Sequence, residues 1–380
     1  MRSRVSRSIG ATVALVAAAS MTACAVDGSP VRAPAALDVG VYGALRESAL
    51  PDATTDAAWA RLRAVRLADH IVFPIDVDPE LTRVKFPTMP IVAETNLTFV
   101  IDGADSVPEL MAMRHGYTVA ADDQASDIGL NHTVLAFAGD RAADAAATAL
   151  AALESRKDQG RQGEGRLRVD GMPDSSVVDH VRVGGSNRVT GITVAGAYIV
   201  VTRARAPEQE HAERIVARAY TEQAKLISGV GPEDTDRNPD PTGLIRGTVA
   251  ILDKDRMIYD RVVRGRRAEA LHHSNGPRAL AAMTTAGITS SATNRTRAHL
   301  AASPRQAQGF RDYVTAAFDS GGAKRADSPR DLSTASCFVS GGTRFSCVVA
   351  VGRYVGEASG GTLLSAQQQI SAAYTFLSQM

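Results

Sequence analysis

The sequence predicts an α+β protein with two domains, each an antiparallel sheet with helices packed on one face. Three observations support this fold class. The chain has 380 residues, 44% of them hydrophobic, which suits about two compact domains. Strand-like runs alternate with amphipathic helices in the same order twice, and a segment rich in Pro and Gly separates the two series. We therefore expect domains at 37–230 and 243–380, joined by a linker at 231–242.

The first series begins with a predicted strand at 133–138, which is followed by an Ala-rich helix at 140–153 with an acidic N-cap. A pair of strands is expected around 176–183 and 190–203. The helix expected at 207–227 places apolar residues at steps of three and four, which gives it one apolar face. This series forms the end of the first domain.

The second series repeats that order. A strand is expected at 297–301, and the helix after it starts at Ser303-Pro304, an N-cap followed by a first-turn proline. Strands at 334–339 and 344–357 follow, and an amphipathic helix at 366–377 closes the chain. Each series is therefore a β-α-β-β-α unit.

The two units share one short sequence pattern before their last helix. Residues 195–200 read AGAYIV and residues 351–356 read VGRYVG. This pattern favours a duplicated unit. The alternative is a chance alignment of alternating strands and helices.

The amino terminus has the organisation of a bacterial secretory signal. Residues 1–23 contain three Arg and no acidic residue, then a short apolar run, and they end in Met21-Thr22-Ala23 directly before Cys24. This ending resembles the lipobox, in which the Cys receives diacylglycerol and becomes the new amino terminus. An ordinary signal peptide with an incidental Cys is the alternative. Residues 24–36 then form a tether after a lipidated Cys24, a thioether-linked and palmitate-bearing anchor.

The predicted cleavage changes the charge of the chain. Loss of Arg2, Arg4 and Arg7 changes 42 basic and 41 acidic residues to 39 and 41, a formal charge of −2. This balance argues against a nucleic-acid partner. The predicted location is the extracytoplasmic face of the cell membrane, where the protein is lipid-anchored.

The two remaining cysteines predict a disulfide. Cys337 and Cys347 lie ten positions apart on either side of a Gly-Gly turn, and the residues around them favour strands. An odd loop of three or five residues centred on Gly342 places the two Cys opposite each other. The compartment beyond the membrane is oxidising, so we expect a structural bridge. A redox-active pair is the alternative, but it lacks the usual C-x-x-C spacing.

Two apparent active-site motifs fail on inspection. Residues 319–322, DSGG, match the nucleophile motif of chymotrypsin-like proteases, but they follow an amphipathic helix that Gly would end. Asp234, Asp236, Asn238 and Asp240 have the spacing that opens a calcium loop, but Pro239 replaces the required Gly. We predict no metal, no cofactor and no catalytic residue.

Three charged or titratable clusters are predicted to be solvated. They are the pair His272-His273, the acidic group formed by Asp122-Asp123 with Asp127, and the basic run of Arg261, Arg264, Arg266 and Arg267.

Several short motifs resemble those of an uncharacterised family of two-domain lipoproteins from mycolate-bearing actinobacteria. The motifs are Asp38-Val39-Gly40-x-Tyr42; Arg66-Leu67-Ala68-Asp69-His70 followed by Pro74 and Val77-Asp78-Pro79; Asp240-Pro241-Thr242-Gly243-Leu244; and Cys347 followed by Val351-Gly352-Arg353-Tyr354. The resemblance covers nearly the whole mature chain. It implies localisation and domain order but no activity.

Three functions fit this sequence. The favoured one is a non-enzymatic envelope lipoprotein that binds a lipid, a glycan or another envelope protein. The second is an envelope hydrolase whose Ser, His and acid meet only in three dimensions. The third is a purely structural envelope protein. A His within hydrogen-bond reach of both a Ser and a buried carboxylate in a cleft would favour the hydrolase.

Overall fold

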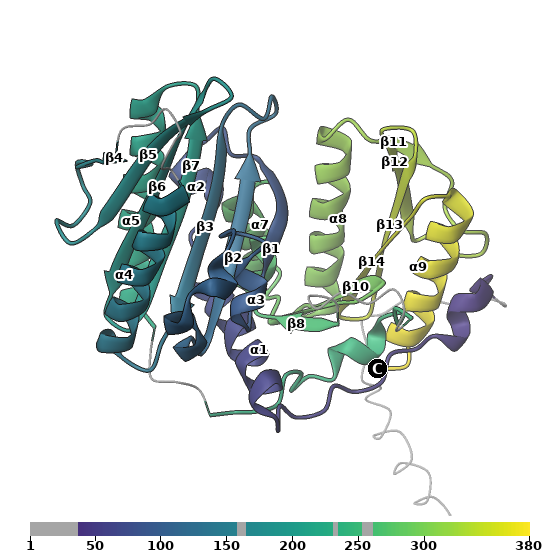
Figure 1. Ribbon diagram of the computed structural model, residues 1–380. Helices are drawn as coiled ribbons and strands as arrows, with labels where there is room; N and C mark the ends of the chain where they lie inside the picture. Colours follow the sequence, from purple (N-terminus) through teal and green to yellow (C-terminus); the bar gives the residue numbers. More distant parts are fainter. Residues whose placement is uncertain (1–36, 158–164, 231–234, 253–260) are drawn as a thin grey trace, which may run out of the picture. The chain divides into compact units, whose positions relative to one another are not determined.

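Two antiparallel sheets of seven strands dominate the computed structural model (Figure 1). The model describes residues 37–157, 165–230, 235–252 and 261–380. The predicted signal peptide, Cys24 and the tether lie outside these residues. The strand orders are β1-β2-β3-β7-β6-β5-β4 in the first sheet and β8-β9-β10-β14-β13-β12-β11 in the second. We call the parts of the chain that contain them the N-terminal half and the C-terminal half.

The N-terminal half contains the following main elements: α1 (Asp56–Leu67), α2 (Pro74–Val77), β1 (Arg83–Ile91), α3 (Glu94–Leu97), β2 (His115–Asp122), β3 (Gly129–Ala136), α4 (Asp140–Lys157), β4 (Gly165–Arg166), β5 (Val177–Val183), β6 (Ser186–Ala195), β7 (Tyr198–Ala206) and α5 (Gln209–Ser228). The 3-10 helices η1 (Gly40–Ala44), η2 (Ala68–His70), η3 (Ala104–Ser106) and η4 (Pro108–Ala112) complete it.

The C-terminal half contains η5 (Leu244–Gly247), β8 (Val262–Arg264), α6 (Arg266–Ala270), α7 (Gly276–Thr285), β9 (Ser290–Thr293), β10 (Thr296–Leu300), α8 (Pro304–Ser320), β11 (Lys324–Ala326), β12 (Ser336–Ser340), β13 (Arg344–Val351), β14 (Tyr354–Gly360) and α9 (Leu363–Leu377).

The strand orders of the two sheets match position by position, which supports the duplication. In each order, three strands precede the last strand of the half, which is β7 or β14. The helices α4 and α8 each follow the third strand along the chain, and α5 and α9 each follow the last. The predicted α+β class with two antiparallel sheets is therefore confirmed.

The predicted β-α-β-β-α unit has three strands, whereas the corresponding stretches contain five, β3 to β7 and β10 to β14. The run expected at 190–203 is divided between β6 and β7, and the run expected at 344–357 is divided between β13 and β14. Two-residue turns begin at Gly196 and Gly352, with φ of 58° and 53°. This left-handed conformation suits a tight hairpin and strains other residues. The shared AGAY and VGRY pattern is thus a shared hairpin turn.

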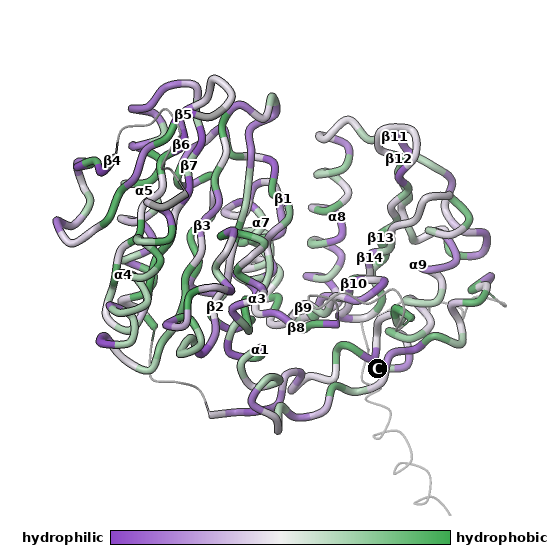
Figure 2. Tube along the Cα trace, viewed as in Figure 1, coloured by the Kyte–Doolittle hydropathy of each residue, from purple (hydrophilic) through white to green (hydrophobic). Residues whose placement is uncertain are grey.

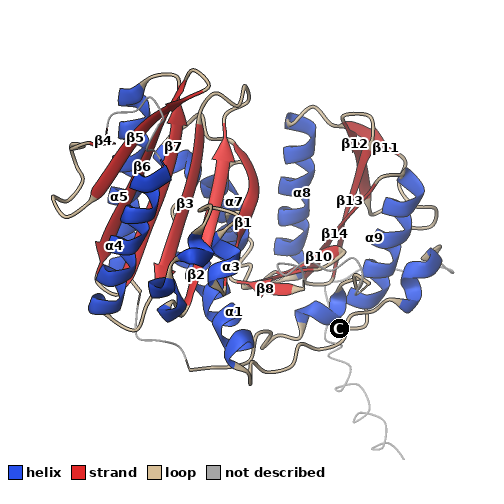
Figure 3. Ribbon diagram, in the orientation of Figure 1, coloured by secondary structure: helices blue, strands red, loops and turns tan. Residues whose placement is uncertain are grey.

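Helices cover both faces of each sheet, which differs from the one covered face that we expected. In the N-terminal half, Ile199 packs with the α4 cluster. In the C-terminal half, Val348 packs with α8 residues and the adjacent Val349 packs with α9 residues. Figure 3 shows α8 and α9 on opposite sides of β13 and β14. Consecutive strand residues point to opposite faces, so a continuous apolar run predicts a strand that is buried on both sides.

One hydrophobic cluster draws residues from both halves. It contains Phe73 and Tyr117 from the N-terminal half together with Phe310 and Phe338 from the C-terminal half. Figure 2 shows α8, which carries Phe310, alternating between hydrophobic and hydrophilic residues along its length. The two halves therefore share part of their core.

The described part of the expected linker is bound to the protein body. Asp240 is 7% exposed, and its carboxylate accepts hydrogen bonds from the backbone N–H groups of Leu244 and Ile245 at the start of η5. Side-chain oxygens of Asp236 and Asn238 accept backbone N–H groups two residues on. These bonds use the oxygens that a calcium loop would need; Asp234 lies outside the described residues.

Candidate functional site

A cavity of about 510 Å³ lies between α8 and one end of the C-terminal sheet. We call it the α8 pocket. Tyr313 and Ala317 line it from α8, and the strands and their turns contribute several charged or hydroxyl side chains. The charged groups and the imidazole that line it are those of Arg295, Arg297, Arg344, Glu357 and His273.

A buried carboxylate lies behind this pocket and holds two guanidinium groups. Glu269 of α6 is 0% exposed, and its Oε2 lies 3.2 Å from Nη1 of Arg264. Its Oε1 lies 3.4 Å from Nε of Arg297, which also lines the pocket. Burial acts to raise the pKa of Glu269, but the two guanidinium groups outweigh it and hold the pKa well below its usual range. The carboxylate therefore stays ionised and fixes Arg297 at the pocket wall.

Ser291, His299 and Glu357 form a hydrogen-bonded chain across three neighbouring strands. Nδ1 of His299 lies 2.8 Å from Oγ of Ser291, and Nε2 lies 2.8 Å from Oε1 of Glu357. Burial opposes ionisation of Glu357, but the hydrogen bond from His299 and the charges of His299 and Arg297 lower its pKa to about 2. Glu357 is thus a carboxylate that lines the pocket and is held in place by His299.

This chain meets the distance criterion for a Ser-His-acid arrangement but not its geometry. Ser291 and His299 are both 0% exposed, and neither lines the α8 pocket. In the hydrolase triad the Ser is bound to Nε2 and the acid to Nδ1, whereas here the two partners are exchanged. Ser291 also pairs directly with His299 across the β9–β10 ladder. The geometry therefore makes Ser291 a packing and hydrogen-bonding residue that no substrate can reach.

His272 and His273, which were predicted to be solvated, are half-buried. The phenol oxygen of Tyr117 lies 3.1 Å from Nε2 of His272. Burial lowers the pKa of both imidazoles, and it does so strongly at His272, where the charge of Arg264 adds to it. Both histidines are therefore neutral at neutral pH. Nε2 of His273 is buried and lacks a hydrogen-bond partner among the described residues, although the side chain lines the α8 pocket.

In the acidic cluster Asp127 is exposed, as predicted, but Asp122 and Asp123 are buried. Asp122 and Asp123 are 5% and 8% exposed. Asp122 accepts a hydrogen bond from Nζ of Lys85 at 2.6 Å and forms an ion pair with Arg83. Asp123 closes the turn between β2 and β3 by accepting the N–H of Ile128. Short side chains that end a strand can thus be drawn into the structure by cations on the adjacent strand.

The basic run does not form one solvated face. Arg264 is 6% exposed and belongs to the Glu269 cluster, and Arg261 lies 3.3 Å from Glu47. Arg267 lies over the ring of Phe73, with its guanidinium carbon 4.1 Å from the ring centroid. Residues two or three apart in this run therefore point to different partners.

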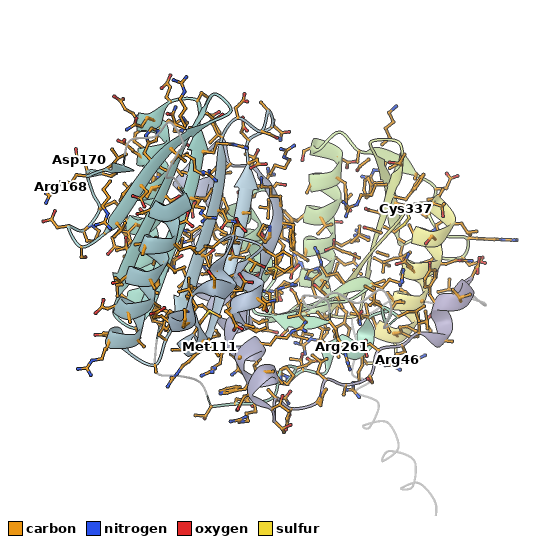
Figure 4. The ribbon with its side chains drawn as sticks, in the orientation of Figure 1. Arg46, Met111, Arg168, Asp170, Arg261 and Cys337 are labelled. Carbon is orange, nitrogen blue, oxygen red and sulfur yellow. A yellow bond between two sulfur atoms is a disulfide. The ribbon has the colours of Figure 1, made fainter. Side chains whose placement is uncertain are left out.

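Cys337 and Cys347 form a disulfide, as predicted, with Cα atoms 4.1 Å apart. The three-residue loop 341–343 places them opposite each other in the β12–β13 ladder. They pack with α9 residues, on the opposite face of the sheet from α8 (Figure 4 labels Cys337). The disulfide therefore belongs to the fold rather than to the pocket.

The motifs that carried the family resemblance have structural roles. The carboxylate of Asp69 accepts the backbone N–H of Ala268 in α6. Asp78 lies 2.7 Å from Nε2 of His211 on α5. The protease-like DSGG segment at 319–322 is also structural. Gly321 ends α8, as we expected, and Asp319 pairs with Arg325. These residues join elements of the fold and do not converge on the α8 pocket.

Neither Glu357, which lines the pocket, nor His299, which holds Glu357 in place, was predicted from the sequence. The signal for both is a charged or titratable residue inside an otherwise apolar strand. His299 stands between Ala298 and Leu300, and Glu357 stands between Gly356 and Ala358. Such residues are rarely buried without a partner, so they point to a polar cluster.

Two negative findings apply to the described residues. No helix there is long and apolar enough to cross a membrane. No group of three or more His, Cys, Asp or Glu side chains in this part of the chain could hold a metal ion.

Comparisons with known proteins place the chain in a family without a known function. No curated protein matches it at a significant level. Among solved structures, the extracellular domain of PknH from Mycobacterium tuberculosis is similar, with 16% identity and a TM-score of 0.30 over 41% of this chain and 93% of that chain. Residues 50–242 match the N-terminal domain of unknown function DUF7373, and residues 230–380 match its C-terminal domain. The chain therefore belongs to the DUF7373 family, and both domains of that uncharacterised family follow each other along it.

Proposed function

We propose that the protein is a non-enzymatic binding module of the cell envelope that takes its ligand in the α8 pocket. In this proposal residues 1–23 are a signal peptide, Cys24 carries diacylglycerol, and residues 24–36 tether the body to the outer face of the cytoplasmic membrane. The ligand classes that fit are a lipid headgroup, a glycan or a segment of an envelope protein.

The observation that supports this proposal most strongly is a difference between the equivalent sheet faces of the two halves. Tyr198 pairs with Ala136, and Tyr354 pairs with Leu300, so the two ladders can be aligned residue by residue. In this alignment, Ser291, His299 and Glu357 stand where the N-terminal half has Gly116, Leu135 and Val201.

An apolar version of this face is therefore compatible with the same topology. Burial of polar and charged groups is costly, and replacement of such a cluster by apolar residues is often neutral or stabilising. A polar cluster that the scaffold does not require and that borders a cavity is a candidate for function.

The accessibility of the Ser-His-Glu chain supports binding rather than hydrolysis. A nucleophile must reach its substrate, and Ser291 is 0% exposed. Labelling of the mature protein with a fluorophosphonate is expected to be negative. Labelling of Ser291 would instead support the alternative function, an envelope hydrolase.

A pocket-filling variant tests the proposal. Ala317 is exposed on α8 and lines the pocket, whereas the adjacent Ala316 is exposed and does not line it. The full-length protein is purified from envelope membranes of the producing cell and examined by native mass spectrometry. We expect a bound mass on the wild type and on Ala316→Trp, and its loss on Ala317→Trp. Retention of the mass by Ala317→Trp would contradict binding in this pocket.

The anchor has its own test. Metabolic labelling with palmitate is expected to mark the wild type, and Cys24→Ala is expected to abolish the label. A label that persists in Cys24→Ala would contradict lipidation at this residue.

A further inference from the structure

We infer that the α8 pocket binds the phosphate ester of a polyhydroxylated molecule, with Arg344 and Arg297 holding the phosphate and Glu357 accepting sugar or polyol hydroxyls. This inference rests on the proposed function, because it names the ligand class of the same pocket. The argument uses the guanidinium groups, the charge balance, the hydroxyl lining and the basic pocket of the other half.

Two guanidinium groups at the pocket can receive an anion. Arg344 is exposed at the start of β13, and its guanidinium forms no hydrogen bond or ion pair with any residue that the structure describes. Arg297 uses Nε for its ion pair with Glu269. This ion pair fixes the orientation of the guanidinium and involves only its Nε. Guanidinium groups bind phosphate oxygens in pairs, and a fixed guanidinium loses less entropy when it binds.

The charges around the pocket leave a positive surplus. The guanidinium groups of Arg264, Arg297 and Arg344 face the carboxylates of Glu269 and Glu357, which leaves a surplus of one positive charge. The lowered pKa of His273 keeps its imidazole neutral at neutral pH. This positive surplus favours an anionic ligand such as a phosphate ester, because a phosphate monoester carries about −1.5 to −2 charges at pH 7.

Hydroxyl recognition comes from the same walls. The hydroxyl oxygens of Ser346 and Ser359 lie 3.0 Å apart, and both residues line the pocket beside Glu357. An ionised carboxylate accepts hydrogen bonds only, so Glu357 selects donors such as ligand hydroxyls. The unpartnered Nε2 of His273 supplies another polar group. An apolar ligand would leave these groups without partners in a site that has lost water.

The N-terminal half also has a basic pocket, which no residue of α4 lines but which includes the position equivalent to Arg344. This cavity of about 530 Å³ is lined by Lys85, Arg188, Arg203 and Arg205 together with Asp122. Arg188 precedes the β6–β7 turn by the same number of residues as Arg344 precedes the β13–β14 turn. There, Lys85 is bound to Asp122 at 2.6 Å and Arg203 to Glu154 at 2.7 Å. A basic residue at this position is thus common to both halves, and among the described residues the guanidinium of Arg344 has no partner.

Titration calorimetry on the mature chain with Cys24→Ser, which prevents lipidation, tests the inference. The soluble probes are glucose 1-phosphate, inorganic phosphate, glucose and glucuronate. We expect glucose 1-phosphate to bind most tightly, inorganic phosphate more weakly, and glucose not at all. Vesicles of phosphatidylinositol and of phosphatidylcholine distinguish a lipid source from a free ester: selective binding to phosphatidylinositol identifies a lipid headgroup, and binding of glucose 1-phosphate alone identifies a soluble ester.

Matched arginine variants locate the binding. Arg344→Gln is expected to weaken binding of the preferred phosphate probe about tenfold or more, because a charge-assisted bond is lost. Arg330→Gln removes an exposed guanidinium outside the pocket and is expected to leave affinity unchanged. The inference is overturned if no phosphate probe binds, if glucose or glucuronate binds equally well, or if the two variants behave alike. If the phosphate probes fail while Ala317→Trp still removes the native bound mass, the ligand class is wrong and the proposed function survives.

Discussion

The two halves of the molecule have the same strand order but different chemistry on one face. Under α4, the N-terminal sheet presents an apolar cluster that includes Leu135 and Val201. Under α8, the C-terminal sheet presents His299 and Glu357 at the equivalent positions, next to a cavity. Both halves have the strand order that the fold needs, and only the C-terminal half has this polar cluster in addition.

Replacement of Glu269 tests the additional charge of the C-terminal half most strongly. Glu269→Gln leaves the buried Arg264 and the half-buried Arg297 without their counter-charge, so we expect a loss of about 3–5 kcal/mol in the free energy of unfolding. Urea unfolding measures it. In the N-terminal half, Glu154→Gln affects a pair whose side chains are 11% and 17% exposed, and a smaller loss of about 1–2 kcal/mol is expected. Equal losses would contradict the special status of the C-terminal cluster.

The disulfide is a second difference between the halves. Cys337 and Cys347 are equivalent to the paired residues Val178 and Gly191. Replacement of both cysteines by Ala is expected to lower the free energy of unfolding by about 2–3 kcal/mol, because the unfolded chain regains the freedom of the closed loop. Urea unfolding with and without a reducing agent measures the effect, and the reducing agent should affect only the wild type.

The reverse experiment sharpens this point. A Cβ atom added at Gly191 would lie 2.6 Å from Cγ1 of Val216 on α5. Val178→Cys with Gly191→Cys is therefore expected to yield no gain in stability, even though the register is the same. A stabilising bridge there would show that α5 can move away.

Much of the fold could be predicted from the sequence because it depends on local patterns. The helices α5, α8 and α9 were predicted from apolar residues at helical spacing, and the disulfide from an odd loop between two strands. The turns at Gly196 and Gly352 were missed because apolar residues on both sides of each turn read as one long strand.

The α8 pocket could not be predicted in the same way. The charged residues that line it come from β10, the turn before β10, β13 and β14, and the buried Glu269 that holds Arg297 comes from α6. His272 and His273 read as polar surface because nothing local shows that Tyr117 and Arg264 pack against them. Burial of a polar residue depends on tertiary partners, which a single sequence does not identify.

Buried histidines give each half a pH dependence. His132 in the N-terminal half is 0% exposed, and its ring nitrogens lie 2.9 Å from Thr202 and 3.0 Å from Gln223. Burial lowers the pKa of His132 to about 4. Between this value and the ordinary pKa of about 6.5, the unfolded chain binds a proton that the folded chain excludes. Stability is therefore complete above pH 6.5 and falls as the pH decreases toward 4.

This pH effect is measurable before the carboxylates titrate. The contribution of His132 to the loss is about 2 kcal/mol between pH 7 and pH 5. His132→Gln is expected to reduce the pH dependence of the free energy of urea unfolding by that amount. His272→Gln tests the C-terminal half in the same window, since burial also lowers the pKa of His272. An unchanged slope in His132→Gln would show that folding does not lower the pKa of this imidazole.

Replacing the polar cluster of the C-terminal sheet by the equivalent residues of the N-terminal sheet has the smallest expected effect on the free energy of unfolding. His299→Leu alone leaves Ser291 and Glu357 without their shared partner, and a loss of about 1–3 kcal/mol is expected. The triple variant Ser291→Gly, His299→Leu and Glu357→Val installs the residues of the N-terminal half. There, a Cβ at Gly116 would lie 2.7 Å from Cδ2 of Leu135, so a leucine at this position requires glycine on the adjacent strand.

We therefore expect the triple variant to be more stable than His299→Leu and within about 1 kcal/mol of the wild type, because an apolar cluster replaces a buried polar one. Its binding should change in a different way. Without Glu357 the pocket loses its acceptor for hydroxyl groups but keeps Arg344, so the affinity for glucose 1-phosphate should fall to that for inorganic phosphate. Urea unfolding and calorimetry on the same preparation test both expectations. A triple variant less stable than His299→Leu would mean that the polar cluster is required by the fold, and the two halves would then differ in structure as well as in binding.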